Sequence, residues 1–339
     1  MKAIQLTENG KLKLSEVDLI NPSKDECQIK VLATGVCSSD IPRAFSNGAY
    51  FYPLIMGHEF SGQITKLGED VNDFSLGDRV AIFPLIPCGD CDECKIKKFQ
   101  RCHNYSYYGS RTNGAYAQYV NVRSWNLIKI PNLISNENAA LIEPISVVLN
   151  AIRKFSKVKK SSKILIMGAG FLGLLAIQIL KKKYESDIFV YDRNKFKLDI
   201  ANKIGALPIK NLEDSDEFDY IIEGTGSSDI FKKSILVSKP SAQIVIMGNP
   251  SSSYEIPQDF VSKVLRKELE IKGTWNSNYK NMRDDWLEAV NLLTNGLNPS
   301  ALVSHRVTLD SAVSQLIDLN KHRKKQISIE HIKSMIIYD

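Results

Sequence analysis

The sequence predicts an α/β protein with two domains, one built on a doubly wound parallel sheet and the other on a barrel-like set of β-strands. The chain has 339 residues, which exceeds one comfortable hydrophobic core and favours two domains. Residues 1–130 contain short strand-like runs separated by turn residues, whereas residues 163–192 read as strand, glycine-rich turn, helix and strand. These patterns place the β-rich domain first and the parallel-sheet domain after it.

The composition is that of an ordinary globular protein. Hydrophobic residues make up 43% of the chain and charged residues 24%, so a largely disordered chain is not expected. The net charge of +6 is modest, and its lysine-rich runs are typical of solvated helix ends and loops. We therefore expect no nucleic-acid partner. A mildly positive field favours an anionic small molecule instead.

The N-terminus and the cysteine content indicate the compartment. Residues Met1–Leu6 alternate apolar and polar side chains, as a strand does, and lack the apolar core of a signal peptide. The longest apolar run, 171–180, is too short to span a bilayer, which needs about 20 residues. We expect a cytoplasmic protein without a membrane partner. Six cysteines in a reducing compartment favour metal binding over disulfides.

The β-rich domain is predicted from three segments. Residues 1–33 and 57–83 read as strands broken by glycine, asparagine and proline turns, and residues 105–130 return to aromatic and β-branched runs. Cys27 lies in one of these strands without a partner at ligand spacing, and we expect an inert, half-buried thiol there. The three segments together predict a barrel-like unit.

A candidate metal site lies between the first two of these segments. Cys37, His58 and Glu59 offer a thiolate, an imidazole and a carboxylate, which are the donors that Zn²⁺ prefers. Three protein ligands leave a fourth position for water or substrate, as in catalytic zinc sites. The alternative is a structural role, because a histidine beside a glutamate is more often structural than a ligand.

A second candidate metal site is a cluster of four cysteines. They follow the spacing C-x2-C-x2-C-x7-C and are Cys88, Cys91, Cys94 and Cys102. Four thiolates within 15 residues can surround one tetrahedral zinc and leave no open position, so this zinc would be structural. The alternatives are a redox or iron–sulfur cysteine set, and a nucleic-acid-binding zinc finger, which leaves the rest of the chain unexplained.

Glu143 is a third candidate ligand, carried on a helix predicted over residues 137–152. Alanine, leucine, isoleucine and valine surround it in sequence, and an ionised carboxylate is costly there unless a cation or hydrogen bonds compensate. A nearby metal would supply that compensation. The alternative is that Glu143 faces water beside Pro144.

The parallel-sheet domain begins with a dinucleotide-binding pattern. A buried strand, 164–167, leads directly into the glycines of a G-x-G-x-x-G turn and then into a helix at 174–180. Asp192 ends the second strand, 24 residues beyond Gly168, where a carboxylate can hold the adenosine ribose hydroxyls. The candidate cofactor-binding residues are Gly168, Gly170, Phe171, Leu172, Gly173, Asp192 and Arg193. Asp192 favours NAD over NADP because it would repel a 2′-phosphate, while Arg193 leaves NADP as the alternative.

The remaining segments complete the predicted organisation. The alternation of strands and helices ends near residue 275, a helix is predicted over 284–294, and a last strand over 335–338. We expect the dinucleotide domain to span 146–285, with error at its boundaries. A dinucleotide site and an open-sided metal site in one chain point to hydride transfer at an alcohol or carbonyl oxygen.

The order of these motifs resembles that of the zinc-containing medium-chain dehydrogenases, and most closely the polyol dehydrogenases of the sorbitol dehydrogenase type. The resemblance covers nearly the whole chain and rests on the frame G-H-E-x-x-G-x5-G that begins at Gly57, the cysteine lobe, the Glu143-Pro144 segment and the dinucleotide glycines. It implies a GroES-like catalytic domain over 1–145 with a structural zinc lobe at 88–102, an NAD-binding Rossmann domain over 146–285, and a return to the catalytic domain over 286–339.

Three shorter segments resemble the branch of this family that acts on sugar-alcohol phosphates. They are Ile41–Ala49, Tyr108–Arg111 and Ile142–Ile145. The resemblance implies oxidation at C5 to a ketose phosphate with NAD, by a homodimer or homotetramer. It also implies that Cys37 and His58 bind the catalytic zinc. Glu59 and Glu143 would then be a direct ligand and a water-mediated or exchanging partner, in either order.

The remaining roles concern proton transfer and substrate binding. Pro42 stands where alcohol dehydrogenases often carry a proton-relay histidine, so Ser39 is the candidate first proton acceptor. Arg43 and Arg111 are candidates for a phosphate clamp, with ordinary surface or dimer-interface residues as the alternative. Asn276 is a further substrate candidate.

Two alternative functions remain at this point. The first is a dehydrogenase of the same family for an unphosphorylated polyol, butanediol or threonine. The second is a non-catalytic structural or sensor protein that binds zinc and a nucleotide. The intact set of metal donors, Cys37, His58, Glu59 and Glu143, argues against this alternative.

Overall fold

The computed structural model describes residues 1–212, 217–250, 252–282 and 284–338. The chain forms two units, one of Met1–Pro144 with Asn278–Asp339 and one of Ile145–Ser277. The return to the first unit was predicted at residue 286 and lies at Asn278. The reason is a set of long-range hydrogen bonds: Gln100 donates to the Asn278 side chain at 3.0 Å, and the Tyr279 hydroxyl donates to a main-chain carbonyl 154 residues earlier, at 2.8 Å.

The first unit is built mainly from β-strands. A seven-stranded sheet has the order β10-β6-β5-β3-β18-β17, with β9 also paired to β3, and smaller sheets have the orders β2-β1-β4 and β7-β8. The strands are β1 (Lys2–Glu8), β2 (Lys11–Glu16), β3 (Glu26–Val36), β4 (Leu54–Ile55), β5 (Glu59–Leu67), β6 (Arg79–Ile82), β7 (Leu85–Ile86), β8 (Ser106–Tyr107), β9 (Tyr119–Arg123), β10 (Leu127–Lys129), β17 (His305–Thr308) and β18 (Ser334–Ile337).

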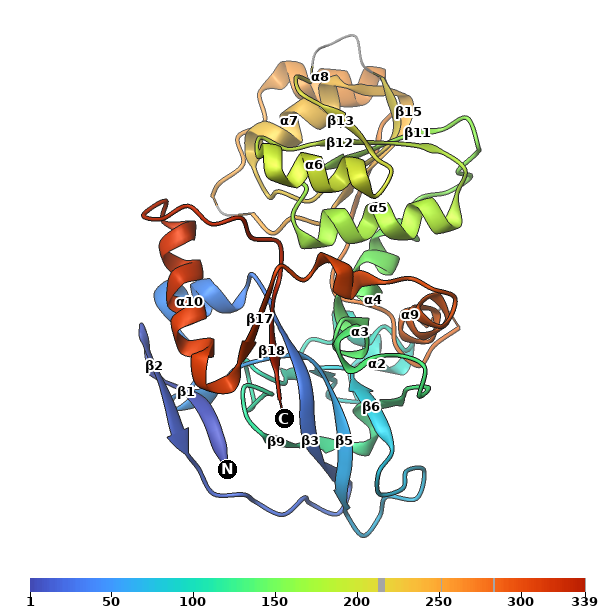
Figure 1. Cartoon of the computed structure of the whole chain (residues 1–339). Helices are drawn as coiled ribbons and strands as arrows, with labels where there is room; N and C mark the ends of the chain where they lie inside the picture. The colour runs from blue at the N-terminus through green and yellow to red at the C-terminus, as the bar shows by residue number, and fades with distance from the viewer. Residues whose placement is uncertain (213–216, 251, 283, 339) are drawn as a thin grey trace. The chain divides into compact units, whose positions relative to one another are not determined.

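Strand β3 occupies the centre of this unit. It pairs with β5 along its length, with β9 at its beginning and with β18 at its end. Figure 1 shows β18, at the red end of the colour scale, beside the blue strand β3. The register sets Gly35 opposite Glu59 and Val36 opposite Ser334. Residues from three distant parts of the sequence therefore meet at one end of β3.

Short helices complete the first unit. They are α1 (Asp40–Pro42), η1 (Arg43–Asn47), α2 (Asp92–Lys95), η2 (Phe99–Arg101), η3 (Ser124–Asn126), α3 (Asn136–Ala140), α9 (Asp285–Thr294), η4 (Pro299–Leu302) and α10 (Leu309–Arg323). The helical stretch predicted over 137–152 is present but divided in two: α3 ends at Ala140 and α4 runs over Ile142–Ile152. Pro144 explains the break, because it has no N–H to continue a helix but fits the first turn of a new one.

The second unit is a doubly wound α/β structure. Its six strands all pair in parallel, in the order β13-β12-β11-β14-β15-β16. The strands are β11 (Lys163–Met167), β12 (Asp187–Tyr191), β13 (Leu207–Ile209), β14 (Phe218–Glu223), β15 (Ser238–Ile246) and β16 (Glu270–Gly273), and the helices are α5 (Phe171–Lys183), α6 (Lys195–Lys203), α7 (Ser228–Leu236) and α8 (Gln258–Arg266). The predicted fold class is thereby confirmed.

Each unit has its own hydrophobic core. In the first, Cys27 packs with Ile29, Val31 and Phe60 and is fully buried, so the prediction of a half-buried thiol is wrong. Burial raises the pKa of Cys27 to about 11, which keeps it a thiol at neutral pH. Among the residues that the structure describes, no helix has the length and apolarity needed to cross a bilayer.

Candidate metal centres and dinucleotide site

The four-cysteine lobe has the geometry of a site for one tetrahedral ion. The sulfurs of Cys88 and Cys102 are 3.4 Å apart, those of Cys88 and Cys94 3.9 Å, and those of Cys91 and Cys102 3.9 Å. A tetrahedral ion with Zn–S bonds of about 2.3 Å requires sulfur–sulfur distances of about 3.8 Å. Backbone N–H groups of His103 and Cys94 lower the pKa of Cys91 to about 6, which favours the thiolate that binds metal. The donor set fits one structural zinc.

The second donor cluster joins Cys37, His58 and Glu59. One ligand atom of each lies within 4.8 Å of the others. Cys37 directly follows β3, and Glu59 begins β5, so the antiparallel pairing of these two strands brings the donors together. His58 and Glu59 are buried, at 8% and 2% exposure, whereas Cys37 is partly exposed. A soft sulfur, an imidazole and a carboxylate with one open side fit a catalytic zinc.

Asp40 orients the histidine of this cluster. The Asp40 carboxylate is fully buried, and its Oδ1 lies 3.5 Å from His58 Nδ1. Its Oδ2 accepts hydrogen bonds from the Tyr116 hydroxyl at 2.6 Å and from the Cys37 main-chain N–H at 3.1 Å. A carboxylate on one ring nitrogen fixes the imidazole so that the other nitrogen faces the metal. Neither Asp40 nor Tyr116 was among the predicted site residues, because the contacts of Asp40 with His58 and of Tyr116 with Asp40 form only in the folded chain.

Lys333 is a further residue that the sequence prediction missed at this site. Its Nζ lies 2.5 Å from Glu59 Oε2, and the two side chains are only 4% and 3% exposed. Burial would lower the pKa of Lys333, but Glu59 and Cys37 raise it above its ordinary value, so the side chain is cationic. Gly35 makes the pair possible, because a Cβ at Gly35 would clash with Glu59 Oε2.

One sequence signal did point to Lys333. It stands between apolar residues, Ile332 and Met335-Ile336, and a lysine in such a run is fully buried only when paired. The partner is 274 positions away, which no local pattern could identify.

Glu143 is buried at 8% exposure, so the alternative in which it faces water is wrong. Its Oε1 accepts a hydrogen bond from the Tyr107 hydroxyl at 3.2 Å, and the Tyr107 ring lies edge-on to His58 with centroids 5.7 Å apart. Burial raises the pKa of Glu143 to about 7. Of the two candidate carboxylates, Glu59 shares the donor cluster with Cys37 and His58, and Glu143 adjoins it through Tyr107.

Ser39 contacts a metal donor directly, whereas the two arginines contact tyrosines. The Ser39 hydroxyl donates to Cys37 Sγ at 3.2 Å. Arg111 lies between two tyrosine rings, with its guanidinium carbon 4.6 Å from the centroid of Tyr50 and 4.4 Å from that of Tyr105. The guanidinium carbon of Arg43 lies 5.9 Å from the same Tyr50 centroid. Both arginines therefore converge on one tyrosine, which is 65% exposed.

Two aromatic rings connect Arg111 to the metal cluster. The Tyr105 ring packs against the Tyr107 ring with centroids 6.4 Å apart, and Tyr107 in turn contacts His58 and Glu143. Arg111 also donates to the Tyr105 carbonyl at 3.1 Å and to the Tyr50 hydroxyl at 3.3 Å. These bonds use two of its five donors and leave the others available to an anion.

The predicted dinucleotide residues lie at the carboxyl end of β11 in the second unit. Gly168 follows the strand, and α5 begins at Phe171. A Cβ at Gly173 would clash with the Gly168 carbonyl oxygen, so only glycine lets the helix pack this closely on the turn. Asp192 ties the turn to β12, since its Oδ2 accepts from the Ala169 N–H at 2.7 Å and its Oδ1 from the Asn194 N–H at 2.8 Å.

Two of the predicted residues have less distinctive surroundings. Arg193 is exposed beside Asp192. Asn276 adopts a left-handed backbone conformation with φ of 51°, and its side-chain oxygen accepts from the Ser277 N–H at 2.9 Å. Asparagine tolerates this conformation better than most residues, which explains Asn276 without a substrate.

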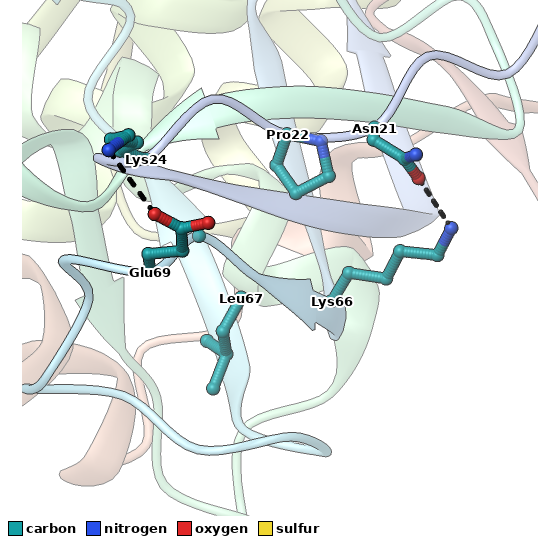
Figure 2. Close-up of a pocket in the computed structure, with 7 residues that line it drawn as sticks. Asn21, Pro22, Lys24, Lys66, Leu67 and Glu69 are labelled. Carbon is teal, nitrogen blue, oxygen red and sulfur yellow. Dashed lines mark hydrogen bonds and ion pairs between the residues drawn. The ribbon is translucent and has the colours of Figure 1, made fainter.

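A surface pocket of about 250 Å³ lies elsewhere on the first unit. Figure 2 shows its two lysines directed at polar partners, Lys24 at Glu69 and Lys66 at Asn21, at distances of 3.3 and 2.8 Å. Leu67 in its wall ends β5, eight residues and about 27 Å from Glu59. The pocket is therefore separate from the metal cluster.

Comparison with known proteins places the chain in a family. Residues 23–132 match the alcohol dehydrogenase GroES-like domain, and residues 136–327 match the glucose dehydrogenase C-terminus. The chain belongs to the zinc-containing medium-chain dehydrogenases. Within this family it is a zinc-dependent alcohol or polyol dehydrogenase that uses NAD or NADP. The predicted family and the predicted cofactors, zinc and a nicotinamide dinucleotide, are thus confirmed.

Two of the most similar curated proteins and one of the most similar solved structures are polyol dehydrogenases. Galactitol 1-phosphate 5-dehydrogenase of Escherichia coli (strain K12) is 32% identical over 314 residues, covering 88% of this chain and 90% of that protein. Sorbitol dehydrogenase of Bacillus subtilis (strain 168) is 30% identical over 354 residues, covering 99% and 97%. The crystal structure of galactitol-1-phosphate dehydrogenase from Escherichia coli superposes with a TM-score of 0.91 at 29% identity and 100% coverage of both chains.

Proposed function

We propose that this dehydrogenase oxidises a sugar-alcohol phosphate with NAD, and specifically galactitol 1-phosphate to L-tagatose 6-phosphate. The observation that carries the proposal is the convergence of Arg43 and Arg111 on Tyr50, with Arg111 joined to the metal cluster through Tyr105 and Tyr107. Two guanidinium groups near one exposed ring can bind a phosphate through paired, charge-assisted hydrogen bonds. The similarity to galactitol 1-phosphate 5-dehydrogenase supports the same substrate.

Each residue of the metal cluster has a distinct part in this reaction. When bound, zinc makes the hydroxyl of an alcohol more acidic, and the oxidised nicotinamide accepts a hydride. Cys37, His58 and Glu59 would hold the zinc, with Asp40 fixing the ring of His58. Glu143, whose pKa is raised to about 7 by burial, would be the water-mediated or exchanging partner that carries a proton near neutral pH.

Ser39 is our proposed first proton acceptor. Its hydroxyl already lies 3.2 Å from Cys37 Sγ and is exposed, so it can reach a substrate at the open side of the cluster. Pro42, one turn later, has no titratable group.

Ser39→Ala is expected to lower kcat by about 10²- to 10⁴-fold, the usual contribution of a positioned proton acceptor, and to leave zinc content unchanged. The measurement is the rate of NADH formation as a function of pH. Ser46→Ala is the matched control, because Ser46 donates to the Pro42 carbonyl and not to a metal donor. Equal rates for the two variants would exclude Ser39 from proton transfer.

We propose NAD as the preferred cofactor, bound by Ile145–Ser277. Asp192 lies at the end of β12 with its carboxylate fixed by two N–H groups, and a fixed negative charge disfavours a 2′-phosphate. Arg193 is exposed beside it and would be the residue to favour NADP.

We also propose a homodimer or homotetramer. β16 is the last strand of its sheet and leaves an unpaired edge, and Ile271 on it is 37% exposed. Exposed edges of this kind favour pairing with another strand. Sedimentation equilibrium would detect the association.

A substrate panel tests the proposed function. We expect galactitol 1-phosphate to be oxidised with a higher kcat/KM than galactitol or sorbitol, and with NAD in preference to NADP. Arg43→Ala and Arg111→Ala should each raise the KM for the phosphate about 10- to 100-fold, because a hydrogen bond to a charged group contributes roughly 1.5–3 kcal/mol. The KM for a free polyol should change little.

Arg123→Ala is the control for this experiment, since the Arg123 side chain is 52% exposed and lies 3.9 Å from its carboxylate partner, Asp25. Equal or better turnover of the free polyols would contradict the phosphate proposal. No NAD or NADP reduction by zinc-replete protein with any alcohol would favour the non-catalytic alternative.

A second candidate is oxidation of an unphosphorylated polyol, and other alcohols such as butanediol or threonine belong with it. The match to sorbitol dehydrogenase over 99% of the chain favours it. The two tyrosine rings and two hydrogen bonds of Arg111 also give that arginine a structural role without a phosphate. The same panel separates the two candidates.

A further inference from the structure

The sheet of the second unit has its topological switch point between β11 and β14. The chain passes from β11 to β12 and β13 on one side, and then begins again with β14 on the other side of β11. In doubly wound sheets, ligands bind outside the carboxyl ends of the strands at this reversal. The turn after β11 carries the glycine motif, and the turn after β14 is Gly224–Ser227. The second turn has no role in the function argued so far.

Glu223, the last residue of β14, is completely buried, and its carboxylate accepts hydrogen bonds from this turn. Its Oε1 accepts from the Thr225 N–H at 2.7 Å, the Thr225 hydroxyl at 2.5 Å and the Gly226 N–H at 3.1 Å. Its Oε2 lies 3.3 Å from the Gly226 nitrogen. Among the residues that the structure describes, no lysine or arginine forms an ion pair with it. The Thr225 hydroxyl in turn accepts from the Ser227 N–H at 3.1 Å.

A buried carboxylate without a cation is costly, so its hydrogen bonds must be kept for the fold to tolerate it. Those bonds direct the N–H groups of the turn inward, onto the carboxylate. The hydrogen bonds to Glu223 therefore fix the backbone conformation of the turn. The ends of β14 and α7 would not fix it by themselves.

This turn packs directly on the glycine motif. Gly168 has a φ of 102°, and a Cβ there would lie 2.9 Å from the Thr225 methyl carbon. On its other side the turn meets Gly248, where a Cβ would clash with the Gly226 nitrogen. The ends of β11, β14 and β15 thus meet at Thr225 and Gly226.

We propose that Glu223 is a positioning residue for the dinucleotide: it holds the turn Gly224–Ser227 as the second wall of the cofactor crevice, opposite the glycine motif. This inference rests on the proposed use of NAD. Glu223 does not touch the cofactor. It acts through Thr225, whose N–H and hydroxyl donate to the Glu223 carboxylate and so fix the turn beside Gly168.

The test measures NADH binding by fluorescence in four variants. Glu223→Ala should raise the Kd for NADH about tenfold or more, because the N–H groups of the turn lose their acceptor. Glu223→Gln keeps one oxygen that can accept the same three bonds and should restore most of the affinity. Thr225→Val removes the hydroxyl but keeps the shape, and should weaken binding more than Thr225→Ser, which keeps the hydroxyl.

Steady-state kinetics adds a readout that a general structural role would not give. In Glu223→Ala and Thr225→Val the KM for NAD should rise while the KM for the polyol stays within about twofold and the zinc content is unchanged. If Glu223→Ala does not fold, the NADH affinities of Thr225→Val and Thr225→Ser test the inference.

Failure of this inference and failure of the proposed function give different results. An NADH affinity of folded Glu223→Ala within twofold of wild type, or equal affinities for Thr225→Val and Thr225→Ser, would overturn this inference and leave the proposed function intact. A wild-type protein that binds neither NADH nor NADPH would overturn the proposed function and this inference with it.

Discussion

Lys333→Met is expected to lower the free energy of unfolding of the zinc-free protein by about 3–5 kcal/mol, the cost of leaving one member of a buried ion pair without its partner. Lys333 and Glu59 are 2.5 Å apart and almost fully buried, so water cannot replace the lost ammonium group. The measurement is urea unfolding, followed by fluorescence of the tryptophans in the first unit. In zinc-loaded protein the loss should be smaller, because the metal supplies a second cation to Glu59.

Two comparisons make this prediction specific. Lys24→Met removes an exposed lysine whose pair with Glu69 leaves the two side chains 72% and 79% exposed, and it should change stability by less than about 1 kcal/mol. Glu59→Gln combined with Lys333→Met should recover most of the loss, because it removes the unpaired charge. If Lys333→Met and Lys24→Met have the same small effect, the pair does not contribute as its burial implies.

Cys37→Ala is expected to reduce the zinc content from two ions per chain to one and to lower kcat/KM by at least about a thousandfold, since one well-placed electrostatic stabiliser alone contributes roughly 10²- to 10³-fold. Cys91→Ala is expected to remove the other zinc. That ion has no open coordination position, so its loss should mainly destabilise residues 88–102. Metal analysis after zinc repletion, together with thermal unfolding, measures both effects.

His305→Asn provides the control for the metal count. His305 is partly exposed in the first unit and belongs to neither donor cluster, so this variant should keep two zinc ions. A wild-type protein that holds one zinc after repletion, bound by the four cysteines, would refute the catalytic centre.

Short-range spacing accounts for what the sequence predicted well. The four cysteines fall within 15 residues, so any compact loop brings them together. The strand, glycine turn and helix around Gly168 form one continuous unit, whose geometry follows from its own residues. His58 and Glu59 are adjacent, and only Cys37 had to be joined to them by strand pairing.

Long-range contacts account for what the sequence did not predict. Four residues have roles that depend on partners that the fold places beside them: Asp40, Tyr107, Tyr116 and Lys333. The return of the chain at Asn278 depends on side-chain hydrogen bonds to Gln100 and Trp125, which strand and helix patterns do not encode.

The sequence alone determined the family, the fold class and the cofactors, because each depends on residue types at fixed local spacing. The tertiary structure decided the surroundings of the metal donors. It buried Glu143, paired Lys333 with Glu59 and set Glu223 beneath the turn that borders Gly168. Burial and partner choice depend on which strands lie side by side, and that is a property of the folded chain.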